Sequence, residues 1–572
     1  MFDKLYEYSL TLGGKLPPPG FQNRRVTKNI FITSSGQLLN IVPVTTEILK
    51  TVSKKDKKTG IVTEETKTII KDFKTYLLPV ERPRRSTNIT PRLIADNSEY
   101  VFGLGNSSKG RHLAYCELLD ICYKETNDEV VGYILDWIQS CNTIALTEQY
   151  EIKPEDNFNI FVDNKSPFED KTLVKWWANY SRPATFIGYC SVTGKQGNIA
   201  QRSPGNVTGL AGSSSTGAYP MSINFESGFS YGMVNAQNTP IDMDVAETIL
   251  NTLSYLANSN ANSHKIYSSG LTYLFWEKVP VGFNPFGALN DPNPDQISNL
   301  FKFVYSGEQG AVDTNKFYMI CVSTNEGRMA VRSYHEMTLP QVVTNIQNWF
   351  DKLSISSCGN YKPNYAMWSL IKSIFPDHEK NYPKHLVSAM FEAAILGRPI
   401  PIECLFKALE RLRVSKSDRP VVLLKAVLQE LGDTNLEGLV VDHSSPAYHC
   451  GRLLAIINYA QFKAVGETGA DIRTKYYSAA ASTPAATFGH LFTGMNTYLS
   501  SLSREHKSKY VEEELAQILS MIGDDFPQRL GYRDQALFAL GFYHQRAKHF
   551  AKGIEAQNST IEVQEEEEED AN

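Results

Sequence analysis

The stretch PIPIECLFKALERLR, residues 399–413, has the residue spacing of an amphipathic helix. Its apolar side chains recur at intervals of three and four and include Ile402, Leu405, Phe406, Leu409 and Leu412. Such spacing places them on one face of a helix, where they can pack on a core. Gly397 and Pro399, just upstream, are typical of the end of a preceding helix. A similar run follows at Leu515, Ile518, Leu519 and Ile522, so the sequence predicts helices after about residue 340.

Before about residue 340, strand-like and helical segments are mixed. The stretch NIFITSSGQLLNIVPV (29–44) predicts two strands around a Ser-Ser-Gly turn, and residues 51–75 predict a charged hairpin or an insertion. Further strands are predicted within 184–192 and 316–323, and helices within 2–10, 111–150 and 244–256. No regular strand–helix alternation indicates a doubly wound sheet, so we predict an α+β fold.

The change of pattern also predicts the domain organisation. A chain of 64.2 kDa exceeds what one hydrophobic core usually serves. We expect a mixed α/β domain over 1–340, with a subdivision near 120–180 left open, and a helical region over 341–434. A C-terminal helical bundle over 435–560 and an acidic, disordered tail over 561–572 (EVQEEEEEDAN from 562 on) complete the prediction.

Charge and cysteine content limit the class of protein. The net charge is −5, yet residues 1–112 hold 19 Lys and Arg against 10 Asp and Glu. This basic end suits a polyanion-facing surface and equally suits a charged surface hairpin, and both readings stay open. The eight cysteines form no CxxC pair, which argues against a zinc ribbon or a redox site. No apolar run approaches about 18 residues, so we expect a cytoplasmic protein without a membrane span.

No motif predicts catalysis. GSSSTG (212–217) lacks the G-x-S-x-G spacing of a nucleophile elbow, and GNSSKGRH (105–112) lacks the Gly-Lys-Ser/Thr ending of a nucleotide phosphate loop. The histidine pairs are six and five residues apart, which does not place two ligands on one helix face. We therefore expect no catalytic residue, no metal and no cofactor.

Eight segments, in order along the chain, resemble one protein family. They cover 16–21 (LPPPGF), 93–104 (LIADNSEYVFGL), 193–232, 317–336, 394–413, 446–461, 476–492 and 536–546 (ALFALGFYHQR). Together they resemble the Csd family, the large subunit of the type I-C CRISPR interference complex, Cascade. The resemblance extends from Pro17 to Arg546.

The resemblance implies a non-catalytic protein of antiviral defence. Such a subunit recognises the protospacer-adjacent motif in double-stranded DNA, helps R-loop formation and presents the target to a separate helicase–nuclease. The implied partners are crRNA, target DNA, the Cascade backbone and crRNA-handle-binding subunits, and a small subunit from internal translation. That small subunit would begin near 433–445, where the sequence has no methionine.

The resemblance directs attention to the stretch GLAGSSSTG (209–217) as a motif-reading loop. Glycine permits close backbone approach to a groove, while backbone N–H groups and serine hydroxyls contact phosphates and base edges. The predicted DNA-binding residues are Gln196, Asn198, Arg202, Gly212, Ser213, Ser214, Ser215 and Gly217. The aromatic residues that follow (Tyr219, Phe225, Phe229 and Tyr231) are expected to anchor the loop in the core. A disordered linker is the alternative.

Two further sets of basic residues are predicted to contact nucleic acid. The phosphate or crRNA contacts are Arg24, Arg25, Arg84, Arg85, Lys109 and Arg111. When the target DNA is unwound, the displaced single strand is predicted to contact Arg452, Arg473, Lys475 and Arg546. Tyr476 and Tyr477 either stack on bases or pack between helices. Ordinary surface charge is the alternative for every basic residue of both sets.

Two other functions stay open on the sequence alone. A metal-dependent nuclease would need a site assembled from residues distant in sequence. A purely structural cap of a ribonucleoprotein would need no DNA contact, and the basic N-terminal end argues against it.

Overall fold

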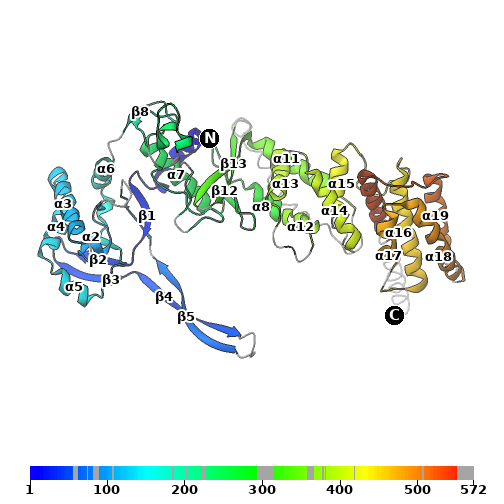
Figure 1. Cartoon of the computed structure of the whole chain (residues 1–572), viewed down its shortest axis with the longest axis horizontal. Coiled ribbons are helices and arrows are strands. Elements are labelled where there is room, and N and C mark those ends of the chain that lie inside the picture. The colour runs from blue at the N-terminus through cyan, green and yellow to red at the C-terminus, as the bar shows by residue number, and fades with distance from the viewer. Residues whose placement is uncertain are drawn as a thin grey trace, which may run out of the picture. The chain divides into compact units, whose positions relative to one another are not determined.

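The computed structural model (Figure 1) describes most of the chain between residues 1 and 549. The described residues are 1–55, 62–73, 75–81, 89–105, 108–182, 186–200, 203–214, 217–220, 226–292, 315–325, 327–356, 366–376, 379, 382–415, 417, 419–469, 471–504 and 508–549. Of these, the side chains of 45–55, 62–73, 108, 109, 235 and 236 are not described. The predicted acidic tail, 561–572, lies outside this set.

The chain forms two compact units, which we describe separately. Unit 1 comprises 1–259 and 324–330, and unit 2 comprises 260–323 and 331–572. This division differs from the predicted boundary at residue 340, because strands of 263–323 share one hydrophobic cluster with the helices that follow residue 339. Among the described residues, sheets lie in the N-terminal part and helices dominate the C-terminal part, so the fold belongs to the predicted α+β class.

Unit 1 is built around a three-stranded sheet of order β3-β2-β7, in which β7 lies parallel to β2. One face carries Ile30 and Ile32 of β2 with Phe158 and Ile160 of β7, which belong to one core cluster with the helices. The opposite face is covered as well: Asn29 and Asn159 are buried, and Asn29 Nδ2 donates to Tyr76 Oη at 2.7 Å. The elements are α1 (Phe2–Leu12), β2 (Lys28–Ile32), β3 (Leu38–Pro43), α2 (Ser98–Val101), α3 (Ser108–Thr126), α4 (Glu129–Ser140), α5 (Thr143–Gln149), β7 (Phe158–Val162) and α6 (Lys171–Tyr180).

Three two-stranded ladders complete unit 1. β1 (Phe21–Arg25) pairs with β6 (Thr75–Pro79), β4 (Thr45–Lys55) with β5 (Val62–Phe73), and β8 (Ile187–Tyr189) with β9 (Gln196–Asn198). The β4–β5 hairpin extends from the body of this unit as a long arm, as predicted for 51–75 (Figure 1). Helix α7 (Met243–Asn258) buries most of its surface and holds several of these segments in place.

Unit 2 combines a four-stranded sheet with a series of helices. The sheet has the order β10-β11-β12-β13, and β11 is buried along its whole length. Its strands are β10 (Ser263–Ile266), β11 (Leu271–Glu277), β12 (Lys316–Asn325) and β13 (Arg328–Thr338). The helices of the first part are α8 (Pro285–Asn290), α11 (Leu339–Leu353), α12 (Met367–Ser373), α13 (Lys384–Leu396), α14 (Ile402–Val414) and α15 (Val421–Glu430). Gly397 ends α13 with φ 68°, which confirms the helix stop predicted from the sequence.

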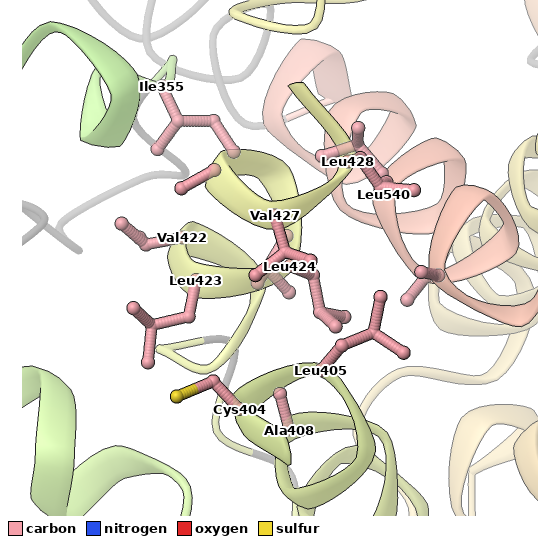
Figure 2. Packing of buried hydrophobic residues seen from close by; sticks show 14 of the residues in the cluster. Ile355, Cys404, Leu405, Ala408, Val422, Leu423, Leu424, Val427, Leu428 and Leu540 are labelled. Carbon is pink, nitrogen blue, oxygen red and sulfur yellow. The ribbon is translucent and has the colours of Figure 1, made fainter. Parts of the chain in front are cut away.

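A bundle of long helices forms the C-terminal part of unit 2. Its helices are α16 (Pro446–Val465), α17 (Ile472–Ala480), α18 (Pro484–Arg504), α19 (Lys509–Ile522) and a final helix over 532–549. Leu540 of the final helix packs beside Leu424 and Leu428 of α15 and Leu405 of α14 (Figure 2). The loop before α16 contains the predicted boundary near 433–437, but the apolar core continues across it.

Candidate nucleic-acid interface

Helix α7 is the scaffold of the predicted motif-reading region. Its N-cap, Asp242, accepts hydrogen bonds through Oδ1 from the N–H groups of Asp244 and Val245 at 3.0 and 3.3 Å. The other carboxylate oxygen, Oδ2, accepts the Asn198 N–H at 3.0 Å. One capping residue therefore stabilises the first turn of the helix and fixes β9 beside it.

The glycine–serine stretch forms a loop that is closed at its base. Val207 and Ala218 exchange two backbone hydrogen bonds of 2.8 and 2.9 Å. Within the loop, Ser213 Oγ donates to Leu210 O at 2.9 Å, and Ser214 Oγ donates to Gly217 O at 3.3 Å. These contacts are those of an ordered turn, so the described part of this loop is not the disordered linker of the alternative reading.

Aliphatic residues anchor the loop. Val207, Leu210, Ala211 and Ala218 are at most 5% exposed. The prediction of an aromatic anchor is wrong at Tyr231, which is 95% exposed. Phe229 and Tyr219 are half-buried, and Phe225 lies outside the described residues. Small apolar side chains suit this site because the neighbouring backbone approaches closely.

The segment 324–330 supports the loop from a second side. Thr324 Oγ1 donates to Ala211 O at 2.8 Å, and the Tyr219 N–H donates to Gly327 O at 2.8 Å. Arg328 directly follows Gly327, forms a parallel bridge with Tyr219 and is exposed. The described structure gives Arg328 no ion pair, so its charge is available to a ligand beside the loop. Sequence reasoning missed this residue, because only the fold brings it next to 219.

Glycine is required at Gly217 for two reasons. Its φ is 87°, and a Cβ there would lie 2.6 Å from the backbone oxygen of Val207. Neither the left-handed backbone nor the contact with a fixed carbonyl tolerates a side chain.

We expect Gly217→Ala to open the base of the loop. The strain of about 1–3 kcal/mol should appear as faster amide hydrogen exchange in 207–218. Gly194 is the matched control, since its φ is 69° but nothing lies within 4 Å of the added Cβ. Equal effects of Gly194→Ala and Gly217→Ala on their local exchange would contradict the role assigned to the Val207 carbonyl.

The structure separates two groups of predicted motif-reading residues. Asn198 is tied to the first turn of α7, whereas Thr208 is tied to its last turn through Ser254 and Asn258. The 16 residues of α7 span about 24 Å along the helix axis. Gln196 and Asn198 therefore belong to the β8–β9 hairpin and not to the glycine–serine loop. That hairpin also exposes Ile187 and Tyr189, by 64% and 72%.

Several predicted residues lie outside the described structure. They are Arg84, Arg85, Arg202 and Ser215, and the side chain of Lys109. Gly212 is exposed with φ 73°. Arg111 pairs with Glu99, while Arg24 lies near Glu81 and Arg25 is exposed.

The expectation of a strand contact at Arg452 needs correction. Arg452 is 0% exposed and donates to Gln545 Oε1 at 3.0 Å, to Val441 O at 3.1 Å and to His449 Nδ1 at 3.2 Å. Burial lowers the pKa of His449, which suits a neutral ring accepting from the guanidinium. The charge of Arg452 is enclosed by the helices that it joins. Arg452 is therefore not a contact for the displaced strand of the target DNA.

The other C-terminal residues differ in exposure. Arg473 is 7% exposed, and its guanidinium lies 5.9 Å from the Tyr477 ring and 5.4 Å from the Phe542 ring. Tyr477 is buried against Phe538 and Phe542, which confirms the helix-packing reading for this residue. Arg546 is half-buried over Phe542. Lys475 and Tyr476 are exposed on α17.

Among the described residues, no group of three or more His, Cys, Asp or Glu is placed to hold a metal ion. Within the same residues, no helix has the length and apolar character needed to cross a membrane.

Comparison with protein families identifies the chain's relatives. A family model described as CRISPR-associated protein (Cas_Csd1) matches residues 4–550. The chain belongs to this CRISPR-associated family. Nothing among the curated proteins matched it. Membership of the Csd1 family makes this a Cascade-type protein of a CRISPR system, in agreement with the resemblance seen in the sequence.

Proposed function

We propose that this Csd1 family protein is the non-catalytic large subunit of a type I-C Cascade complex and recognises the protospacer-adjacent motif in duplex DNA. The family match over 4–550 supports the complex, and the loop 208–217 supports the recognition. Its partners in this proposal are crRNA, the backbone and crRNA-handle-binding subunits, and a small subunit from internal translation. It aids R-loop formation and presents the target to a separate helicase–nuclease.

The loop suits a groove because its exposed positions are small. Gly212 and Ser214 are exposed, whereas Leu210, Ala211 and Gly217 are buried beneath them. The absence of bulky side chains at the exposed positions permits a backbone approach to base edges. Arg328 beside the loop supplies a cation for a phosphate.

The orientation of one hydroxyl narrows the base preference. Ser213 donates its hydroxyl hydrogen to Leu210 O, so the oxygen of this hydroxyl is left to accept. The minor groove presents a donor only at the guanine N2 amino group. We therefore expect the loop to favour a G·C pair at the position that it contacts.

The test is selection from guide-matched duplexes with a randomised flank, bound by the reconstituted complex at fixed salt. A short motif should be enriched, and the enrichment should vanish when this chain is omitted. Replacing Ser213 and Ser214 together by Ala should cost roughly 1–3 kcal/mol at one position and relax its preference.

Arg328→Ala should instead weaken binding to every flank alike. It should also reduce the slope of log affinity against log salt concentration by about one. Lys171→Ala, at an exposed cation of α6, is the control and should change neither quantity. Binding that is indifferent to the flank would reject motif recognition and leave the structural-cap function.

A further inference from the structure

The β8–β9 hairpin of unit 1 has one face packed against the N-cap of α7 and one face exposed. On the packed face, a Cβ added to Gly197 would lie 2.5 Å from Asp242 Oδ2, and the register partner of Gly197 is Gly188. This pair of glycines allows the hairpin to lie close to the helix. Ile187 and Tyr189 belong to the opposite face, because side chains alternate along a strand, and they are 64% and 72% exposed.

The outer edge of β9 is covered by the segment 240–242. The Asn198 N–H donates to Asp242 Oδ2 at 3.0 Å, and the Ala200 N–H donates to Ile241 O at 3.0 Å. These contacts fix the hairpin to the body of unit 1 through one of its two edges. The other edge, along β8, has a different environment.

The backbone groups of Ile187 and Tyr189 face away from β9. Phe186 and Cys190 each form a backbone hydrogen bond across the hairpin, of 2.8 and 2.9 Å. Alternate residues of an antiparallel strand face the partner strand, so Gly188 faces β9 as well. The N–H and C=O groups of Ile187 and Tyr189 therefore lie along the outer edge. Within the described residues, no strand or bridge pairs with this edge.

This outer edge has the features of a pairing edge. Natural proteins protect an exposed edge with lysine, proline or a bulge, yet β8 is Ile-Gly-Tyr and its register is regular over 187–189. A two-stranded hairpin is only marginally stable by itself, and a third strand would extend its sheet. The outward N–H and C=O groups are satisfied best by another extended backbone.

The composition of the hairpin favours a protein over a nucleic acid as the occupant of this edge. Residues 186–198 (FIGYCSVTGKQGN) contain one charged residue, Lys195, which lies beyond β8 in the turn. Contacts with a phosphate backbone depend mainly on cations, and β8 offers none. Ile187 and Tyr189 offer apolar surface instead, and such side chains stabilise a sheet by packing on cross-strand neighbours.

We propose that β8 is a docking edge, which pairs with an extended strand of another protein subunit of the CRISPR ribonucleoprotein complex. Ile187 and Tyr189 form main-chain hydrogen bonds with that strand, and their side chains pack on its apolar side chains at alternate positions. The inference rests on the proposed function for the complex to which this subunit belongs. It concerns the edge of β8 and not the DNA contacts expected at Gln196 and Asn198 of β9.

The experiment measures the affinity of the full chain for the crRNA-bound backbone subunits, without target DNA. Tyr189→Pro removes an outward N–H that the β8–β9 ladder does not use, so the hairpin should persist. The double substitution Ile187→Thr and Tyr189→Thr keeps β-branched residues in the strand and removes the apolar surface. We expect each variant to bind about tenfold more weakly. Tyr267→Thr, at a tyrosine of unit 2 that is 75% exposed, is the matched control and should bind as the wild type does.

Hydrogen exchange resolved to single residues distinguishes strand pairing from a general loss of structure. In the isolated chain, the amides of Ile187 and Tyr189 should exchange faster than the amide of Gly188, which faces β9. On assembly with the protein subunits, the exchange of the first two amides should slow on the order of 100-fold, because each gains a backbone acceptor.

Wild-type affinity in both β8 variants would overturn the proposal, and so would unchanged exchange at Ile187 and Tyr189 on assembly. Slower exchange caused by crRNA alone or by a DNA duplex alone would also overturn it and assign the edge to a nucleic acid. This assembly needs no target DNA, whereas flank selection does. A failure of the docking edge is therefore distinguishable from a failure of the proposed function.

Discussion

Replacing Gly451 or Gly541 by alanine is expected to disrupt the C-terminal bundle. A Cβ at Gly451 of α16 would lie 1.9 Å from the backbone oxygen of Phe538, and one at Gly541 would lie 2.1 Å from that of Tyr448. The two glycines face each other's helices, so α16 and the final helix cross with their backbones nearly in contact. Since both neighbours are backbone atoms, the clash is relieved only by moving a whole helix.

We expect a loss of roughly 3 kcal/mol or more for either substitution. Movement of the final helix would separate Leu540 from its neighbours on α14 and α15 (Figure 2). It would also disturb the hydrogen bond between Gln545 and Arg452. Packing and the buried polar contacts should therefore be lost together.

Hydrogen exchange is the appropriate measurement, because the six tryptophans all lie before residue 369 and do not report on this bundle. Amides of 446–465 and 532–549 should exchange on the order of 100-fold faster in Gly451→Ala and Gly541→Ala. Gly489 and Gly494 of α18 are matched controls, since nothing lies within 4 Å of an added Cβ. Alanine there should be neutral or stabilising by up to about 1 kcal/mol. Wild-type exchange in Gly451→Ala would show that the helices do not cross at this glycine.

Mild acid is expected to destabilise unit 2 through buried histidines. Burial lowers the pKa of His544 to about 3 and that of His264 to about 4. His544 is 1% exposed, and its Nδ1 lies 2.8 Å from Tyr448 Oη. Burial also lowers the pKa of His443, whose ring stacks on Tyr448, and of His449.

The direction of this pH effect on stability follows from the number of protons that each state binds. Each of these rings has a lower pKa in the folded chain than in the unfolded chain, so the unfolded state binds more protons below about pH 6.5. The stabilisation is complete above that pH and is lost as the pH falls towards the folded values. Each such histidine should cost roughly 1 kcal/mol for each pH unit in this window.

The measurement is the thermal midpoint of the full chain between pH 8 and pH 4. In His544→Phe the thermal midpoint should fall less steeply as the pH is lowered. The midpoint at pH 8 should itself be lower than in the wild type, because Tyr448 Oη loses a partner. The control is His385→Gln, since His385 is largely exposed and its replacement should leave the acid profile unchanged. Parallel profiles for wild type and His544→Phe would show that His544 does not contribute to the acid sensitivity.

Local features of the fold followed from the sequence. The spacing of Ile402, Leu405 and Leu409 predicted α14, and Gly397 predicted the end of α13. The α+β class was predicted as well, and the hairpin among the alternatives for 51–75 is present as β4 and β5. Residue periodicity determines such elements because each depends on contacts between residues that are close in sequence. The order of the family segments likewise sufficed to identify the family.

The tertiary structure alone decided which of the charged residues are exposed. Arg452 and Lys475 were equivalent in the sequence, yet one is enclosed by helices and the other is exposed. Arg328 gained its exposed position beside the loop from a bridge to Tyr219. Periodicity indicates which face of a helix is buried, but the availability of a charge depends on segments distant in sequence that pack against it.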